Sequence, residues 1–159
     1  MFEQMMQNRV RWRIPSPFYQ GCRSIIAQLA RLVAHPVGYV TLWEQADVPS
    51  LVALLREDAW FTMPPLPVWY QGRAAITLLL QTHLFTLGLQ WRLLPTHANG
   101  SPAFGLYRRE AFADDYQLFG LVVLGVEGEQ IVSLIAFLEV SSLSFFALPL
   151  TLPRVCAEG

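Results

Sequence analysis

The sequence contains no lysine, and only 14% of its 159 residues carry a charge. Without lysine, the chain cannot form a Schiff base with a carbonyl substrate or use an amine as a general base. Its two cysteines, Cys22 and Cys156, are too few for a disulfide scaffold and lack the spacing of metal ligands. We therefore interpret them as free thiols in a reducing compartment.

Long hydrophobic runs are also missing, although 53% of the residues are apolar and the mean hydropathy is +0.36. A membrane-spanning helix needs about 18 consecutive apolar residues. The stretch 76–91 is interrupted by polar residues, the stretch 118–126 is too short, and the chain shows no secretory signal at its start. We expect no membrane contact and a cytoplasmic location, with the apolar excess in a core, an internal cavity or a subunit interface.

The few charges are unevenly distributed. Residues 1–36 hold five arginines against Glu3, whereas residues 37–159 hold six arginines against eleven acidic residues, so the two parts carry +4 and −5. A basic arm on an acidic body is typical of nucleic-acid or membrane contact, but we favour a solvated helix face with a poorly ordered start. Because the total is only −1, we expect no direct nucleic-acid binding.

Apolar spacing predicts helices in the first half of the chain. One helix is expected from Arg23 and is interrupted at Pro36, since proline cannot donate the bond of an interior turn. The pattern resumes at Val40, and Asp47 is a suitable N-cap for a short helix that runs to Leu55.

A strand is expected over Ala59–Met63, followed by a rigid extended loop over Pro64–Tyr70 that contains three prolines. A last helix is expected over Arg73–Leu87, where Gly88 ends it. The second half predicts antiparallel strands joined by tight turns, at Gln90–His97, Ala103–Arg109, Tyr116–Val126 and Gln130–Glu139, with an apolar tail that packs back.

Helices followed by strands predict an α+β fold rather than a parallel doubly wound sheet. Consecutive hairpins make a long curved antiparallel sheet, and the helices can cover one of its faces. Such a sheet forms a cone whose mouth is a natural place for a pocket.

Several segments of the sequence resemble SnoaL-like domains, which belong to the nuclear-transport-factor-2-like cone fold. Tyr39–Asp47 is similar to the opening of such a domain. Phe61–Ile76 and Pro95–Phe104 resemble a loop with its helix and a hairpin in the C-terminal SnoaL-like domain of some extracytoplasmic-function sigma factors, and Phe146–Pro153 is also similar. The resemblance divides the chain into an N-terminal extension, 1–36, and a SnoaL-like domain, 37–159.

The resemblance carries expectations about function. In such sigma factors, promoter recognition belongs to separate helical domains, which 36 residues cannot hold, so we expect an accessory domain that stands alone. In ketosteroid isomerases of the same fold, a tyrosine on the first helix donates to the developing oxyanion and an aspartate is the general base. The matching positions are Tyr39 and Met63. Because a thioether accepts no proton at neutral pH, that isomerase mechanism is not expected here.

Three residues remain as catalytic candidates. Tyr39 is either an oxyanion donor or a core tyrosine with a satisfied hydroxyl. His97, just before the Asn99-Gly100 turn, is a candidate general base. Glu139 is a candidate acid or base if it points inward like Phe137, and an ordinary strand-end charge if it points outward. The histidines are far apart in the sequence, so we expect no metal site, and no cofactor is indicated.

The candidate ligand-binding residues are mostly aromatic. The stiff proline loop presents Trp69 and Tyr70, which either cap a pocket or pack against the following helix. Trp91 and Tyr107 are expected to line the same cavity from neighbouring strands. The full set is Phe61, Met63, Trp69, Tyr70, Trp91, Tyr107, Phe119 and Phe137.

Arg92 and Arg108 are expected on one face of the sheet. There they would hold a carboxylate ligand, form a salt-bridged surface, or make a dimer contact.

Three functions fit the sequence. The first is a cone domain that binds a small, largely apolar ligand, with Tyr39, His97 or Glu139 as polar groups. The second is a cofactor-independent SnoaL-like cyclase or isomerase that uses His97 or Glu139. The third is a regulatory interaction module that contacts RNA polymerase or a sigma factor. We expect binding rather than catalysis, and a homodimer in all three cases.

Overall fold

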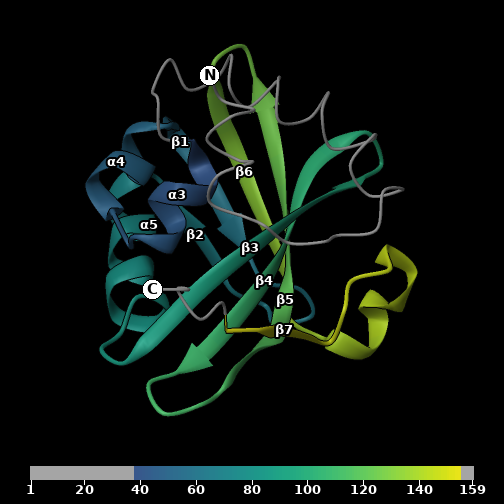
Figure 1. The fold of residues 1–159 in the computed structure, drawn as a ribbon. Coiled ribbons are helices and arrows are strands. Elements are labelled where there is room, and N and C mark those ends of the chain that lie inside the picture. The colour runs from purple at the N-terminus through teal and green to yellow at the C-terminus, as the bar shows by residue number, and fades with distance from the viewer. Residues whose placement is uncertain (1–37, 155–159) are drawn as a thin grey trace.

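Short helices pack on one face of a curved sheet in the computed structural model, which describes residues 38–154 (Figure 1). The helix expected from Arg23, the basic N-terminal extension and both cysteines lie outside these residues. The described helices are α3 (Tyr39–Glu44), α4 (Val48–Ala53) and α5 (Arg73–Leu79). The last continues directly as a π-helical turn, η1 (Leu80–Leu84), so the expected helix ends three residues before Leu87.

The sheet combines the predicted hairpins with a first strand that arrives from the helical half. The hydrogen-bonded strands of the sheet lie in the order β2-β1-β6-β5-β4-β3, and β7 pairs with β5. All pairings are antiparallel except that of β1 with β6, which is parallel. The strands are β1 (Leu55–Thr62), β2 (Trp69–Gln71), β3 (Leu89–Ala98), β4 (Ser101–Glu110), β5 (Asp115–Glu127), β6 (Gln130–Phe137) and β7 (Thr151–Pro153). The predicted α+β class is confirmed.

Two local features place the helices and the long hairpin as the sequence predicts. Asp47 caps α4, where its carboxylate accepts hydrogen bonds from the Ser50 backbone N–H at 3.2 Å and the Ser50 hydroxyl at 2.8 Å. In the turn between β3 and β4, Asn99 has a φ of +50° and Gly100 a φ of +75°. A two-residue hairpin turn needs this left-handed conformation at both of its residues, and asparagine and glycine tolerate it best.

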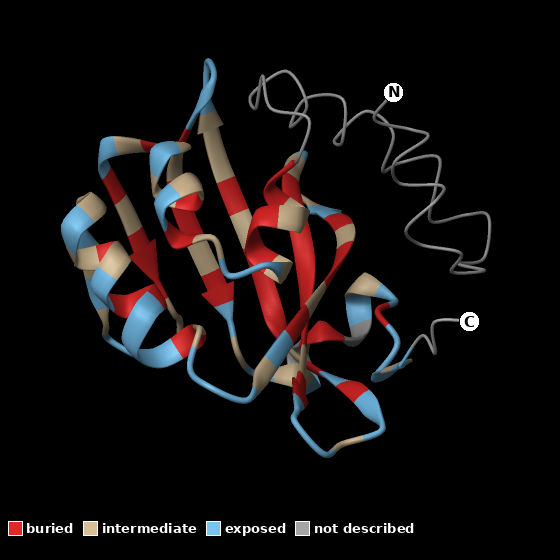
Figure 2. Ribbon diagram, turned by 60° about the vertical axis from the view of Figure 1, so that its left-hand side comes forward, coloured by how far each residue is buried: buried red, intermediate tan, exposed pale blue. Residues whose placement is uncertain are grey.

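The sheet is covered on both faces (Figure 2). Between the helices and the sheet lies a cluster that we call the inner cluster, and on the opposite face lies the outer cluster. The inner cluster includes Tyr39, Leu42, Trp43, Val48, Leu51, Leu55, Ala59, Phe61, Ile76, Leu79, Leu80, Leu84, Trp91, Leu93, Phe104, Leu106, Val122, Leu124, Ile131, Leu134 and Ala136. The outer cluster includes Leu94, Ala103, Tyr107, Tyr116, Leu118, Leu121, Leu143 and Leu148.

The apolar tail closes the outer face. After β6 the chain forms a 3-10 helix, η2 (Val140–Phe146), and then reaches β7. Leu143 and Leu148 from this tail are buried in the outer cluster, which confirms that the tail packs back on the body.

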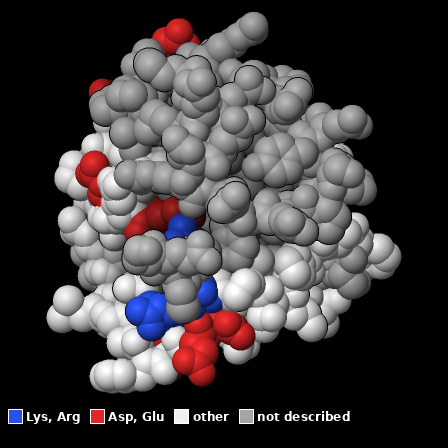
Figure 3. All heavy atoms as spheres, in the orientation of Figure 1, with Lys and Arg blue, Asp and Glu red and all other residues white. Residues whose placement is uncertain are grey.

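On the face shown in Figure 3, some acidic side chains lie apart from any basic one, and others lie beside arginines toward the lower edge. Arg56 contacts both Asp58 and Glu127 through its guanidinium. No helix within residues 38–154 combines the length and the apolar character that a membrane crossing requires.

Candidate functional site

The inner cluster is an apolar interior without a single charged member. Helix α3 supplies two polar atoms of this cluster, the Tyr39 hydroxyl and the Trp43 indole nitrogen, from positions one helical turn apart. The helix is fastened to the edge strand β3 by Glu44. One carboxylate oxygen accepts from the Leu93 backbone N–H at 3.2 Å, and the other lies 3.5 Å from the Arg92 guanidinium. The two inward-facing residues of α3 are therefore held at a fixed place over the sheet.

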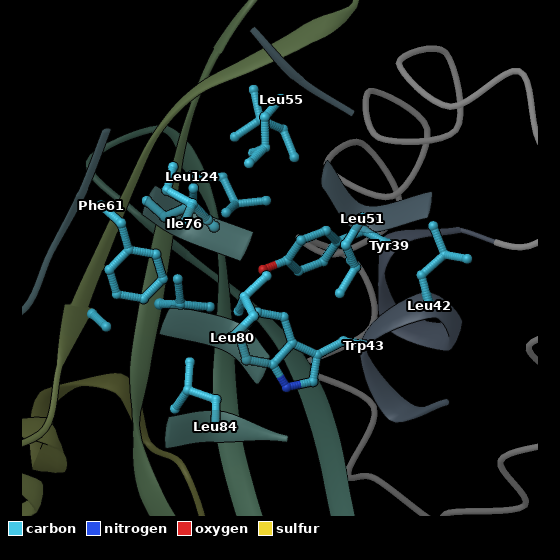
Figure 4. Close-up of a cluster of buried hydrophobic side chains, with 14 of the residues drawn as sticks. Tyr39, Leu42, Trp43, Leu51, Leu55, Phe61, Ile76, Leu80, Leu84 and Leu124 are labelled. Atoms are coloured by element: carbon cyan, nitrogen blue, oxygen red, sulfur yellow. The ribbon is translucent and has the colours of Figure 1, made fainter. Parts of the chain in front are cut away.

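Tyr39 is 2% exposed, and its ring packs against Phe104 at a centroid distance of 5.2 Å. Its hydroxyl points toward the middle of the inner cluster (Figure 4) and has no hydrogen-bond partner among the residues that the structure describes. Burial raises the pKa of this hydroxyl well above its ordinary value, because the phenolate would lose its hydration. Tyr39 is therefore a protonated donor facing an apolar interior.

Trp43 is the second buried donor. Its indole Nε1 also lacks a hydrogen-bond partner within residues 38–154. The ring is held by edge-on contacts with Phe85 at 5.2 Å and Trp91 at 6.3 Å between centroids. By contrast, the Nε1 of Trp91 in the same cluster donates to the Leu84 carbonyl at 3.0 Å. The protein can therefore supply a hydrogen-bond acceptor to an indole nitrogen in this interior, but within residues 38–154 it supplies none to that of Trp43.

Five of the candidate ligand-binding residues lie with Tyr39 on the inner face. Phe61 and Trp91 are buried within the inner cluster. The partly buried side chains of Met63, Tyr70 and Phe119 pack against it. Phe119 also contacts Trp91 edge-on at 5.4 Å between centroids and lies under the Arg108 guanidinium at 4.6 Å. Their role in ligand binding stays a prediction.

The other three candidates lie elsewhere. Trp69 is 63% exposed, and its ring stacks on Trp60 of β1 at 4.8 Å and an angle of 15°. Tyr107 belongs to the outer cluster, where its hydroxyl donates to the Pro149 carbonyl at 2.8 Å. Phe137 is 37% exposed, and its partner in the ladder, Leu121, also belongs to the outer cluster.

Two expected pairings of side chains are wrong because of the hairpin register. The two-residue turn pairs Ala98 with Ser101, so Trp91 lies opposite Arg108 and Arg92 lies opposite Tyr107. Side chains directly opposite one another share a face, and successive residues alternate. Trp91 and Tyr107 are thus on opposite faces of the sheet, and so are Arg92 and Arg108.

The remaining catalytic candidates are solvent-exposed. His97 lies at the exposed end of β3, next to the turn. Of the two directions left open for Glu139, the structure shows the outward one: Leu138 packs against the inner cluster, whereas Glu139 is exposed and accepts a hydrogen bond from the Ser141 hydroxyl at 3.4 Å. Within the described part of the chain, no three His, Cys, Asp or Glu side chains gather as a metal site would require.

Sequence reasoning missed Trp43, although a signal was available. Trp43 follows Tyr39 by four residues, which places both side chains on one face of a helix. It also missed Arg109, a buried cation on β4 that directly follows the candidate Arg108.

The comparisons with known proteins agree with this geometry. No family model matches the chain. In sequence, the chain is 36% identical over 114 residues to the extracytoplasmic-function RNA polymerase sigma factor SigG of Mycobacterium tuberculosis, in strains H37Rv and CDC 1551. The match covers 70% of this chain but only 30% of the sigma factor.

Solved structures show the fold. A proposed ketosteroid isomerase from Kribbella flavida matches 70% of this chain and 77% of its own length, with a TM-score of 0.52 and 22% identity. An NTF2-like protein of unknown function from Mesorhizobium loti matches 71% of this chain and 92% of its own length, with a TM-score of 0.54 and 17% identity. A proposed polyketide cyclase from Xanthomonas campestris matches 80% of this chain and 98% of its own length, with a TM-score of 0.51 and 16% identity.

The chain therefore has the cone fold of the nuclear-transport-factor-2-like, SnoaL-like proteins, as the sequence motifs predict. Within that fold, it is similar to a segment of a sigma factor, and the predicted resemblance is confirmed.

Proposed function

We propose that this chain contains a SnoaL-like domain that binds a small, neutral, largely apolar molecule inside the cone. The observation that carries the proposal is the Tyr39 hydroxyl, buried and without a partner among the described residues. A buried donor left unpaired costs about 1–3 kcal/mol of stability. A ligand oxygen that accepts from Tyr39 would remove that cost, and the apolar cluster would enclose the rest of the molecule.

The ligand is neutral in this proposal because hydrophobic side chains surround the Tyr39 hydroxyl, and Arg108, which borders them on the same face, already lies over the Phe119 ring. The two donors, Tyr39 and Trp43, favour a molecule with acceptor oxygens such as carbonyl, ether or ester groups.

Binding is favoured over catalysis by the positions of the proton acceptors. Position 63, which matches the general base of ketosteroid isomerases, is methionine. His97 and Glu139 are both exposed, so neither shares the buried surroundings of the Tyr39 hydroxyl. A cofactor-independent isomerase or cyclase reaction is the second candidate, because a protonated tyrosine in an apolar interior can stabilise an oxyanion.

We further propose that ligand binding is regulatory and acts in transcription. The support is the 36% identity to a segment of a sigma factor. In this proposal, the ligand changes how the domain contacts RNA polymerase or a sigma factor. A pull-down against RNA polymerase, with and without the ligand, tests this contact independently of the binding step.

The binding proposal is tested by native mass spectrometry. Wild type, Tyr39→Phe and the control Tyr116→Phe, which lies on the outer face, are each incubated with a lipophilic extract of cells that encode the chain. We expect wild type and the control to carry a discrete adduct of a few hundred daltons and Tyr39→Phe to carry much less. Bare protein in all three samples, or equal adducts in all three, would contradict the proposal.

A further inference from the structure

A second site lies on the outer face of the sheet, around Arg109. This side chain is only 5% exposed. One terminal nitrogen donates to the Ala113 carbonyl at 2.8 Å, the other contacts the Gln90 side-chain oxygen, and the Nε has no partner within residues 38–154. Both acceptors are neutral. No acidic side chain in the described part of the chain forms an ion pair with Arg109.

A buried cation with only neutral partners is an unusual arrangement. Ions lose their hydration on burial, and proteins offset this cost by pairing them with an opposite charge. A guanidinium carries five N–H donors in a planar fork that matches the oxygens of a carboxylate or a phosphate. The free Nε and the missing counter-charge both indicate that the surroundings of Arg109 are completed by an anion.

A second arginine lies on the same face of the sheet. Arg92 is on the neighbouring strand β3, and both guanidinium carbons lie over the Tyr116 ring, at 5.7 Å for Arg92 and 5.4 Å for Arg109. The side chain of Arg92 is 31% exposed, which leaves the cluster open to solvent on that side. Its contact with Glu44 is long at 3.5 Å, while the other Glu44 oxygen accepts from the Leu93 backbone.

We infer that Arg92 and Arg109, packed around Tyr116, form a binding site for the oxyanion group of a small molecule, a carboxylate or a phosphate. The site is separate from the interior proposed for the neutral ligand. Gln90 and Arg109 are partners in the ladder, and Trp91, which lies between Gln90 and Arg92, points to the opposite face. The two sites thus lie on opposite faces of the sheet.

The test uses the full chain at constant ionic strength, with chloride as the balancing anion. Inorganic phosphate is one probe and acetate is the other. NMR follows the Nε–Hε resonance of Arg109, and thermal unfolding is measured in parallel. We expect a saturable shift and a raised Tm with at least one probe. Saturation by phosphate alone identifies a phosphoryl ligand, and saturation by acetate identifies a carboxylate ligand.

Arg92→Gln provides the variant, and Arg108→Gln, one residue from Arg109 but on the inner face, provides the matched control. Loss of one ionic hydrogen bond should weaken binding roughly tenfold or more in Arg92→Gln, while Arg108→Gln binds like wild type. Arg92→Lys keeps the charge but loses the planar fork, and serves if the glutamine variant does not fold. A linear response to both probes in wild type, or the same saturation in the Arg92 variants, would overturn the inference.

Discussion

The rings of Tyr39 and Trp43 lie 5.8 Å apart between centroids, one turn apart on α3, and neither polar atom is hydrogen-bonded within the described residues. Both side chains are at most 2% exposed. Most buried polar groups in folded proteins have a partner. Two exceptions on one helical turn favour a common explanation, and the proposed ligand supplies one.

Removal of the Tyr39 hydroxyl should stabilise the protein without ligand. Tyr39→Phe deletes an atom that has no described partner and keeps the ring that packs on Phe104. We expect the free energy of unfolding in urea to rise by about 1 kcal/mol or more, since the cost of an unpaired buried hydroxyl is removed. A loss of stability would show that the hydroxyl is hydrogen-bonded in the ligand-free protein.

Alkaline pH should unfold the protein through Tyr39. Its pKa in the folded state is raised above the ordinary 10.0 by burial, so the folded state keeps its proton where the unfolded state releases it. Tyr39 therefore has no effect on the pH dependence well below pH 10, and stability falls as the pH rises above about 10. Unfolding midpoints between pH 8 and pH 11.5 measure this. The decline should be shallower in Tyr39→Phe, and identical slopes would contradict the prediction.

The C-terminal tail should loosen when the Tyr107 hydroxyl is removed. That hydroxyl donates to the Pro149 carbonyl at 2.8 Å, next to Leu148 of the outer cluster. Tyr107→Phe should cost about 0.5–1.5 kcal/mol, the usual net contribution of one hydrogen bond. Hydrogen exchange should speed up in residues 140–153 and stay unchanged in α3. Unchanged exchange in the tail would mean that packing alone holds it.

The N-cap of α4 should contribute measurably to stability. Asp47 accepts two hydrogen bonds from Ser50, so Asp47→Ala should lower the free energy of unfolding by about 1 kcal/mol. Asp114→Ala, at an exposed position in the turn before β5, serves as the control and should change stability little. Equal effects of the two variants would mean that the cap adds nothing beyond surface charge.

Dimer formation is tested in solution. The composition predicts a homodimer, since 53% of the residues are apolar and exposed side chains include Leu66 and Trp69. Sedimentation velocity at micromolar concentration should give a species of about twice the 18.0 kDa chain mass. A single monomeric species would contradict the prediction.

The order of helices and strands could be predicted from short stretches of sequence, because a helix cap or a tight turn depends mainly on its own residues. Asp47 can cap a helix from its own position in the sequence, and Asn99 with Gly100 can form a tight turn wherever two strands meet. The parallel pairing of β1 with β6 could not be predicted in this way, since it joins residues more than 70 positions apart. Nothing in the local sequence of either strand specifies its partner.

The site was harder to predict because the direction of a side chain depends on which face of its strand is buried, and on which side. The turn at Asn99-Gly100 forms as predicted and pairs Arg92 with Tyr107, so a common face for Arg92 and Arg108 did not follow from that turn.

The direction of Glu139 depended on that of Phe137, and Phe137 lies opposite Leu121 of the outer cluster. Tyr39 was expected as an oxyanion donor or as a core tyrosine with a satisfied hydroxyl. It lies in the core, but whether its hydroxyl has a partner depends on the surrounding strands, which the local sequence does not specify.

Ligand binding in the cone is measured most directly by a crystal structure of the protein after incubation with the lipophilic extract. We expect electron density for a small molecule inside the inner cluster, with an acceptor atom within hydrogen-bond distance of the Tyr39 hydroxyl. An interior filled by its own side chains, with no added density beside Tyr39, would contradict it.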